Sequence, residues 1–448
     1  MATLVVQGCA GYEPKPLAGG EVDALLESPD RVALARQAGQ LQHPLLAPIT
    51  IDFAKPLTGD EIAVLAVLAN PDLRALRARQ HVADAQVFAS GLLPDPQISL
   101  GIDKVVSSND PTLVSGYANS LSLDILSGLA TRHADMKQAK AAAEQVRLDI
   151  AWQEWTLAGH AKVLALRAQY LAKIATLAGA AADSADLALS RAMTAAARGD
   201  LKGDVIEVRR VAAADARDRA LTAGRDALAT RMELNATLGM KPDESLSLAA
   251  APSMTAWAGH EPGQLFDMAR TKRLDLAALA AGYESQEATV LRAVLGQYPR
   301  LGITLNQARD TGNIITRGPA VSFDLPLWNR NRGAIATANA DRDRLRAEYA
   351  ARLHQARAEI AALVAALDHD ERARALLEAQ LPELIRIADA IVGAVAQGDL
   401  SEPAGLDARS AAVDKQIALL GLAQLCAEQR IALALAVGLP IIEGTELP

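Results

Sequence analysis

Aromatic side chains are scarce in this chain of 448 residues: Phe, Trp and Tyr together make up 3% of it, although half of the residues are hydrophobic. Much of the apolar total is alanine, which is the best helix former and buries little area per residue. This composition does not suit a compact globular enzyme. It suits long, closely packed helices.

The chain also has no excess of basic residues, since its formal net charge is -8 and its pI is near 5.5. A nucleic-acid partner would require a basic face, so none is expected. No stretch approaches the ~18 apolar residues of a membrane-spanning helix. A membrane location would therefore require a β-barrel.

Motifs for chemistry are missing as well. The sequence has no glycine-rich phosphate loop, nucleophile elbow, cysteine cluster or pair of histidines at helical ligand spacing. Asp368-His369-Asp370 could suggest a metal site, but a solvated helix face is the simpler interpretation. We therefore expect a protein that is not an enzyme and that uses no cofactor or metal.

Only two cysteines are present, and their settings differ. Cys426 lies in an apolar helical stretch, which favours a small buried residue. Cys9 follows Leu4-Val5-Val6-Gln7-Gly8, which looks like the end of a lipoprotein signal, where the cysteine becomes the lipidated N-terminus. No basic segment precedes it, which a start codon further upstream would explain. The alternative is an incidental N-terminal cysteine.

Three landmarks recur in the same order at an offset of about 200 residues, which indicates duplication of a whole unit rather than a solenoid repeat. They are an Asp-Leu-x-Ala-Leu motif, a Ser-x-Asp motif and a Gly-Asp-Leu turn. Their copies begin at Asp72 and Asp275, at Ser122 and Ser322, and at Gly199 and Gly398. The chain then divides into a signal remnant with an extended segment, residues 1–60, a first copy, residues 61–250, and a second copy with the C-terminal tail, residues 251–448.

Each copy is expected to contain a helix, two alternating strands joined by a polar loop, a very long helix and a shorter returning helix. In the first copy these elements fall at residues 61–90, 97–103, 120–125, 130–198 and 204–238. In the second copy they fall at residues 264–295, 300–306, 322–325, 332–397 and 407–437. Each long helix would span roughly 100 Å, which is too long for one globular core.

The strands carry apolar residues on one face and Ser, Thr, Asn, Asp or Gly on the other. A soluble sandwich would show the same alternation, but there is no second sheet for these strands to pack on. Four strands are too few to close a barrel, for which about eight is the usual minimum. Several chains would have to share one barrel, since open sheet edges are not tolerated in lipid.

This order of elements resembles that of the TolC-type outer-membrane efflux proteins, and so do several motifs. They are Asn70-Pro71-Asp72-Leu73, Gly91-Leu92-Leu93-Pro94-Asp95-Pro96, the two Gly-Asp-Leu turns, and the helix ends Leu238-Gly239 and Gly438-Leu439-Pro440. The resemblance covers residues 61–440. It implies a mainly α fold with a membrane β-barrel contribution, in which a homotrimer forms a twelve-stranded β-barrel and a periplasmic α-helical barrel.

The resemblance implies an exit channel of a tripartite efflux system in the outer membrane of a Gram-negative bacterium, anchored in outer-membrane lipid through Cys9. A periplasmic adaptor and an inner-membrane pump of the RND type would complete the system. Metal ions or small toxic compounds would be the substrates. The alternatives are the exit channel of a type I protein secretion system and, from another class, a periplasmic coiled-coil adaptor or scaffold.

The resemblance also implies roles for the tips of the two helical hairpins. The residues that would contact the adaptor are Arg198, Gly199, Asp200, Leu201, Gly398, Asp399 and Leu400. Glu402 and Asp407 would line the periplasmic gate, although Pro403 and Ala404 depart from the family's pattern. A helix stop at Gly followed by a restart at an Asp cap would explain both tips without any partner.

Overall fold

The computed structural model describes residues 11–17, 19–107, 109–123, 125–199, 203–250, 261–299, 301–324 and 326–439. It is mostly helical and contains one β-sheet. The chain divides into two compact units, each described here by itself. The first comprises Met1–Leu41, Pro48–Asn70 and Leu164–Ala251, and the second comprises Gln42–Ala47, Pro71–Val163 and Pro252–Pro448. The long helix α5 (Ile125–Ala197) contributes to both.

The first unit has its core at the short helix α3 (Gly59–Ala69), which is apolar on nearly every side. Ile62, Leu65 and Val67 are fully buried, as expected of a helix enclosed by its neighbours. Thr58 and Glu61 form a reciprocal capping box that fixes the start of α3. The unit also contains α1 (Gly19–Leu25), α2 (Arg31–Ala38) and α6 (Gly203–Thr237).

Helices α1 and α2 lie in the segment that the sequence predicted to be extended. The Asp30 carboxylate accepts a hydrogen bond from the Val32 amide and so caps the start of α2. This region is also tied to the chain that follows α6. Ser28 donates a hydrogen bond of 2.6 Å to Glu244, and Arg31 forms an ion pair with the same carboxylate. Residues 19–38 are therefore a folded part of the first unit.

The structure has two helices where the sequence predicted one at residues 61–90. Helix α3 ends at Ala69 with Asn70 as its C-cap, and α4 (Pro71–Ser90) begins immediately after this residue. Asn70 has a ψ of 127°, because a proline forces the preceding residue out of the helical region.

A second break divides the helix predicted at residues 264–295. Helix α7 (Pro262–Lys272) and helix α8 (Leu274–Leu295) are separated by Arg273, whose ψ is 120°. No proline follows Arg273, so local sequence does not explain this break. Its cause is the set of buried contacts that the Arg273 side chain makes.

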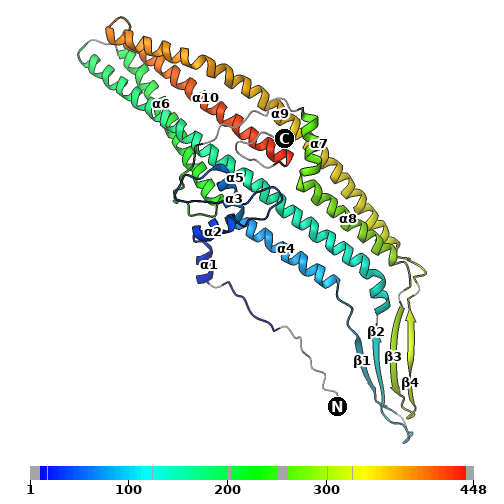
Figure 1. The fold of residues 1–448 in the computed structure, drawn as a ribbon. Coiled ribbons are helices and arrows are strands. Elements are labelled where there is room, and N and C mark those ends of the chain that lie inside the picture. The colour runs from blue at the N-terminus through cyan, green and yellow to red at the C-terminus, as the bar shows by residue number, and fades with distance from the viewer. Residues whose placement is uncertain are drawn as a thin grey trace. The chain divides into compact units, whose positions relative to one another are not determined.

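The second unit contains the sheet, which consists of β1 (Gln97–Asp103), β2 (Gly116–Leu123), β3 (Leu301–Arg309) and β4 (Ile315–Phe323). The strands pair antiparallel in sequence order, so two hairpins join through β2 and β3 into one meander (Figure 1). Strands β2 and β4 begin earlier than predicted, because cross-strand pairing extends the ladder into segments whose composition indicated loops.

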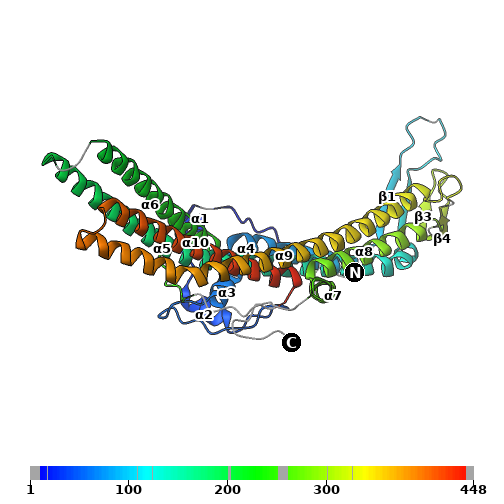
Figure 2. The same cartoon turned by 90° about the horizontal axis from the view of Figure 1, so that it is seen from above.

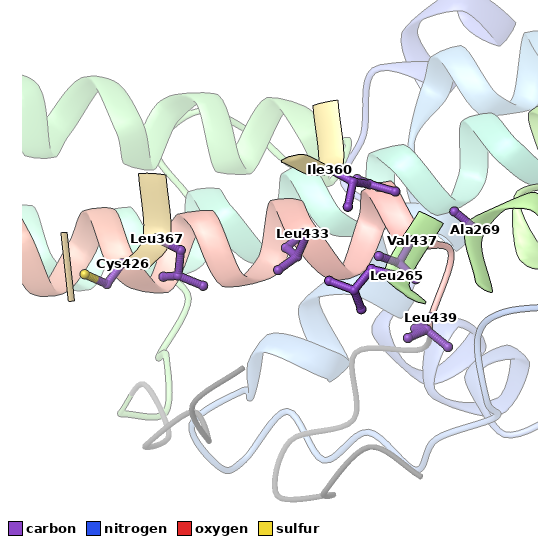
Figure 3. Close-up of a cluster of buried hydrophobic side chains, with 9 residues drawn as sticks. Leu265, Ala269, Ile360, Leu367, Cys426, Leu433, Val437 and Leu439 are labelled. Carbon is purple, nitrogen blue, oxygen red and sulfur yellow. The ribbon is translucent and has the colours of Figure 1, made fainter. Parts of the chain in front are cut away.

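Helices α9 (Arg332–Gln397) and α10 (Glu402–Val437) form a long antiparallel hairpin in the second unit, orange and red in Figure 2. Helix α9 has the predicted bounds, whereas α10 begins earlier than predicted. A buried cluster joins both helices to α7 (Figure 3). Its members are Leu265, Ala269, Ile360, Leu367, Cys426, Leu433, Ala436, Val437 and Leu439.

One helical segment within the described ranges, Pro403–Val437, is long and apolar enough to cross a membrane, judged by length and composition alone. The prediction that no stretch approaches a membrane-spanning helix is therefore wrong. The core helix of a soluble protein passes the same test, and this segment buries Cys426, Leu433 and Val437 against α7 and α9. In total, 33% of its most apolar stretch is buried in the chain.

The same order of elements occurs in residues 59–237 and again in residues 262–437: a helix pair, a strand pair, a long helix and a returning helix. This order agrees with the plan that the sequence predicts. The duplication that would explain it stays a prediction.

Candidate functional site

The four-stranded sheet has two chemically different faces, because successive side chains on a strand point to opposite sides. The register places Leu121 opposite Ile98 on one neighbour and opposite Leu305 on the other. We call this side the apolar face. Its apolar members include Ile98, Leu100, Ile102, Leu121, Leu301, Ile303, Leu305, Ile315, Val321 and Phe323, and toward the hairpin loops the same side carries Asn119, Gln307, Arg309 and Arg317.

The opposite side carries small and polar residues, and we call it the small-residue face. Its members include Ser99, Gly101, Ser120, Ser122, Gly302, Thr304, Asn306, Ala320 and Ser322. Both faces are open in the isolated chain: every residue of β1 and β4 is exposed. Leu100 and Ile102 are 76% and 82% exposed, although a soluble monomer would cover such side chains. The sheet is therefore amphiphilic, and both of its faces are exposed in the single chain.

The tip of the second hairpin is a tight turn. Gly398 has a φ of +83°, a left-handed conformation that favours glycine. Its amide donates to the Val395 carbonyl at 3.1 Å, and the Asp399 amide donates to the Ala394 carbonyl at 2.9 Å. Leu400 follows with its side chain 45% exposed. The turn thus presents an apolar side chain at the end of the hairpin.

The tip of the first hairpin is described only in part. Gly199 also has a φ of +83°, and its amide donates to the Ala196 carbonyl at 2.9 Å. Arg198 is exposed. Asp200 and Leu201 lie outside the described residues. The predicted helix stop at glycine is present at both tips, whereas contact with an adaptor stays a prediction.

The predicted gate residues lie at the start of α10. Glu402 is the first residue of this helix, and Asp407 is exposed in its second turn. Pro403 lies in the first turn, where a proline fits because its amide would have no partner within the helix. Pro403 is therefore compatible with the start of α10, and its departure from the family's pattern stays a prediction. The gate role stays a prediction.

Of the two cysteines, Cys426 lies within the described residues. Cys426 is a fully buried free cysteine, and burial raises the pKa of its thiol, which confirms the interpretation of a small core residue. Cys9 lies outside the described residues, so its lipidation stays a prediction.

No metal centre is formed within the described part of the chain, where no three His, Cys, Asp or Glu side chains gather to hold an ion. In the motif around His369, the Asp370 carboxylate accepts a hydrogen bond of 2.6 Å from Gln429 of α10, and Asp368 forms an ion pair with Arg372. The carboxylates of Asp368 and Asp370 therefore interact with side chains of α9 and α10.

A buried ionic cluster at the break between α7 and α8 was missed by sequence reasoning. The Arg273 guanidinium, whose side chain is 1% exposed, donates to both carboxylate oxygens of Asp275 at 3.0 and 2.9 Å. It also donates to the Ala436 carbonyl at 2.9 Å and to Glu359 at 3.3 Å, and it lies over the Trp152 ring. We call these residues, together with Arg352, the Arg273 cluster.

Burial favours protonation of Asp275, but its hydrogen bonds and charge interactions with Arg273 and Arg352 outweigh that effect. They hold the pKa of the Asp275 carboxyl below its usual value. The Arg352 Nε atom donates to Asp275 at 2.6 Å, so this carboxylate is shared between two guanidinium groups. The cluster connects α8, α9, the end of α10 and, through Trp152, α5.

The first unit has a simpler counterpart. The buried Asn70 side chain donates a hydrogen bond of 2.9 Å to the carbonyl of Thr237, the last residue of α6. Arg273 does the same for Ala436 near the end of α10. Asn70 immediately precedes Pro71-Asp72, and Arg273 immediately precedes Leu274-Asp275, which are corresponding positions of the repeated motif. A polar residue before each aligned motif is the signal that could have revealed the cluster.

Residues 265–439 match a family model described as outer membrane efflux protein. No curated protein matches the chain in sequence. The match lies within the second predicted copy and includes the hairpin of α9 and α10.

Solved outer-membrane channels have a similar fold. The Campylobacter jejuni outer membrane channel CmeC is 16% identical over 87% of each chain, with a TM-score of 0.72. The outer membrane protein VceC of Vibrio cholerae is 17% identical over 86% of this chain and 97% of its own, with a TM-score of 0.69. CusC is 15% identical over 89% of this chain and 98% of its own, with a TM-score of 0.67. At such identities the likeness shows the fold alone.

The family match comes from the sequence of the second half, and the structural similarity extends across most of the chain. Outer membrane efflux proteins are passive channels, so the match of residues 265–439 agrees with the prediction of a protein that is not an enzyme. The chain is thus similar to outer membrane efflux proteins in the sequence of residues 265–439 and to solved outer-membrane channels in fold.

Proposed function

We propose that this chain is the exit channel of a tripartite efflux system and works as a homotrimer in the outer membrane of a Gram-negative bacterium. The observation that carries the proposal is the exposed amphiphilic sheet. Its apolar face suits lipid and its small-residue face suits a water-filled channel. The long helical hairpins would extend into the periplasm.

The pairing of the strands supports a shared barrel. Strands β1 and β4 each have one unpaired edge, which lipid does not tolerate. Because the four strands alternate in direction, β4 of one chain can pair antiparallel with β1 of the next. Three copies related by rotation would close a twelve-stranded barrel without breaking the antiparallel pattern.

The exposed apolar side chains of helix α6 are a second argument for an assembly of several chains. The helix carries large apolar side chains that are more than half exposed in the isolated chain: Val208, Val211, Leu221 and Leu228. An exposed apolar surface of this kind marks a protein interaction site. Neighbouring protomers or the adaptor would cover it.

The assembly predicts a detergent-extracted trimer. Membranes from an expressing Gram-negative strain should release the chain only with detergent, and light scattering should give the mass of three chains. Replacing Leu100 by Asp should prevent stable insertion, because it places a charge on the apolar face. Ser99→Asp, on the small-residue face, is the matched control and should insert. A monodisperse water-soluble monomer of the wild-type chain would refute the proposal.

The transport role requires partners of two kinds. A periplasmic adaptor would dock at the hairpin tips, and an inner-membrane pump of the RND type would supply the energy. Metal ions or small toxic compounds are the proposed cargo, and Glu402 and Asp407 the proposed gate. Loss of resistance to such compounds on deletion of the gene, with protein secretion unchanged, would favour this role over a type I secretion channel.

Lipid attachment at Cys9 is part of the proposal. With the native upstream sequence in its host, Cys9→Ala should abolish incorporation of radiolabelled palmitate, while Cys426→Ala should retain it because Cys426 is buried. Mass spectrometry should locate the acyl chains on Cys9. An unmodified Cys9 in the mature wild-type protein would contradict the anchor and leave the channel proposal intact.

A further inference from the structure

The connection between β4 and α9 is held in an unusual conformation. Arg330 and Asn331 both have positive φ, +44° and +53°, which is unfavourable for residues with a side chain. The Asn331 side chain donates a hydrogen bond of 2.7 Å to the Ala293 carbonyl in the last turn of α8. A Cβ on Gly296, the residue that ends α8, would lie 2.6 Å from the Asn331 amide nitrogen. The connection is therefore fixed against the end of α8.

This fixed connection exposes large apolar side chains. Trp328 is 92% exposed and Leu327 is 60% exposed. Exposing an indole to water is unfavourable, because the free energy gained by burying apolar surface grows with the area that is buried. Asn329, Arg330 and Arg332 are exposed beside it. Tryptophan next to arginine is the combination found at membrane–water interfaces, where the indole lies among headgroups and the guanidinium reaches phosphate.

The exposed indole lies next to the apolar face of the sheet along the chain. Phe323, five residues before Trp328, ends β4 and is paired with Leu301, which starts β3. Tyr298, three residues before Leu301, is 61% exposed. Tyr298 and Trp328, both exposed, thus lie within a few residues along the chain of the end of the sheet at which β3 begins and β4 ends. An aromatic belt at the edge of the apolar band is typical of membrane sheets.

We propose that the connection between β4 and α9 is a preorganised membrane anchor, which places Trp328 in the phospholipid headgroup region of the periplasmic leaflet, with Arg330 at the phosphates. The inference rests on the proposed channel function, which puts the sheet in the membrane. The Asn331 contact to α8 fixes the depth at which the helices begin, because the anchor is attached to α8 and α9 at once.

Brominated phospholipids test the anchor, since bromine quenches only tryptophan in contact with lipid. The detergent-extracted protein is reconstituted in phosphatidylcholine vesicles with bromine near the headgroup or near the end of the acyl chain. The chain has four tryptophans, so the fluorescence of the wild-type protein should fall by the contribution of one of them. The loss should be larger with bromine near the headgroup than with bromine near the end of the acyl chain. Trp328→Phe should lose this quenching. Trp152, 27 residues or roughly 40 Å along α5 from its start, serves as a reference in both proteins.

A second variant separates this inference from the channel proposal. In the Trp328→Phe background, Leu100→Trp puts an indole on the apolar face of the sheet. One outcome contradicts the anchor alone: bromine deep in the bilayer quenches the indole at position 100, but wild type and Trp328→Phe are quenched to the same extent. In that case Trp328 does not contact lipid, and the channel proposal stands. If neither indole is quenched, both are wrong. Shallow quenching of Trp328 with deep quenching at position 100 supports the anchor.

Discussion

Replacing Arg273 by Met is expected to destabilise the protein by about 3–5 kcal/mol, because it leaves buried Asp275 without its bidentate partner. The Ala436 carbonyl would lose its donor at the same time. Arg273→Lys should give a smaller loss, since the ammonium keeps the charge but cannot reach Asp275 with two parallel hydrogen bonds. The denaturant dependence of helical circular dichroism and the rate of limited proteolysis measure the effect.

Arg270→Met is the matched control. Arg270 lies one turn away on α7 and forms an ion pair with Asp267, but both side chains are more than half exposed. The loss for such a surface pair should be within about 1 kcal/mol. Equal stabilities of the Arg273→Met and Arg270→Met proteins would show that the Arg273 cluster does not stabilise the fold.

The same cluster should make the stability depend on pH. The pKa of Asp275 is lowered in the folded protein, so its contribution is complete above the unfolded-state value, about 3.9, and is lost as the pH falls below it. Asp275→Asn should therefore be less stable than wild type at neutral pH. The difference should shrink as the medium is acidified through that range. A difference independent of pH would contradict this account of Asp275.

Replacing Leu400 by Asp is expected to abolish export while the trimer remains intact. The side chain is exposed at the tip of the second hairpin, where docking of an adaptor would desolvate it, and a buried unpaired carboxylate is strongly unfavourable. The measurements are resistance of cells to the exported compound, crosslinking to the adaptor and trimer mass in detergent. Resistance should fall to that of the deletion strain.

Ile387→Asp is the matched control, because Ile387 lies on α9 before the tip and is 43% exposed, close to the 45% of Leu400. It should retain crosslinking to the adaptor. Gly398→Leu is less informative, since the positive φ would strain the turn itself. Gly398→Asn tolerates that conformation better and should fold. Full export by Leu400→Asp would leave the tip as an ordinary helix end.

The helices and strands were largely predictable because their signals are local. Alternation within residues 97–103 predicts β1 with its observed bounds, and the periodic pattern of residues 332–397 predicts all of α9. Glycine marks both hairpin tips, since the turn requires a positive φ. The break at Asn70 could have been predicted from Pro71, because the residue before a proline avoids the helical region.

The sequence by itself determined the long helices, the alternating strands and the glycine turns, since propensity and periodicity act over a few neighbouring residues. Only the tertiary structure decided the break at Arg273 and the conformation of the connection before α9. Arg273 leaves the helix because its guanidinium meets Asp275, Glu359 and the Ala436 carbonyl from three parts of the chain. Asn331 adopts a positive φ because its amide fills the space beside Gly296. Such contacts join residues far apart in sequence, so no local pattern reveals them.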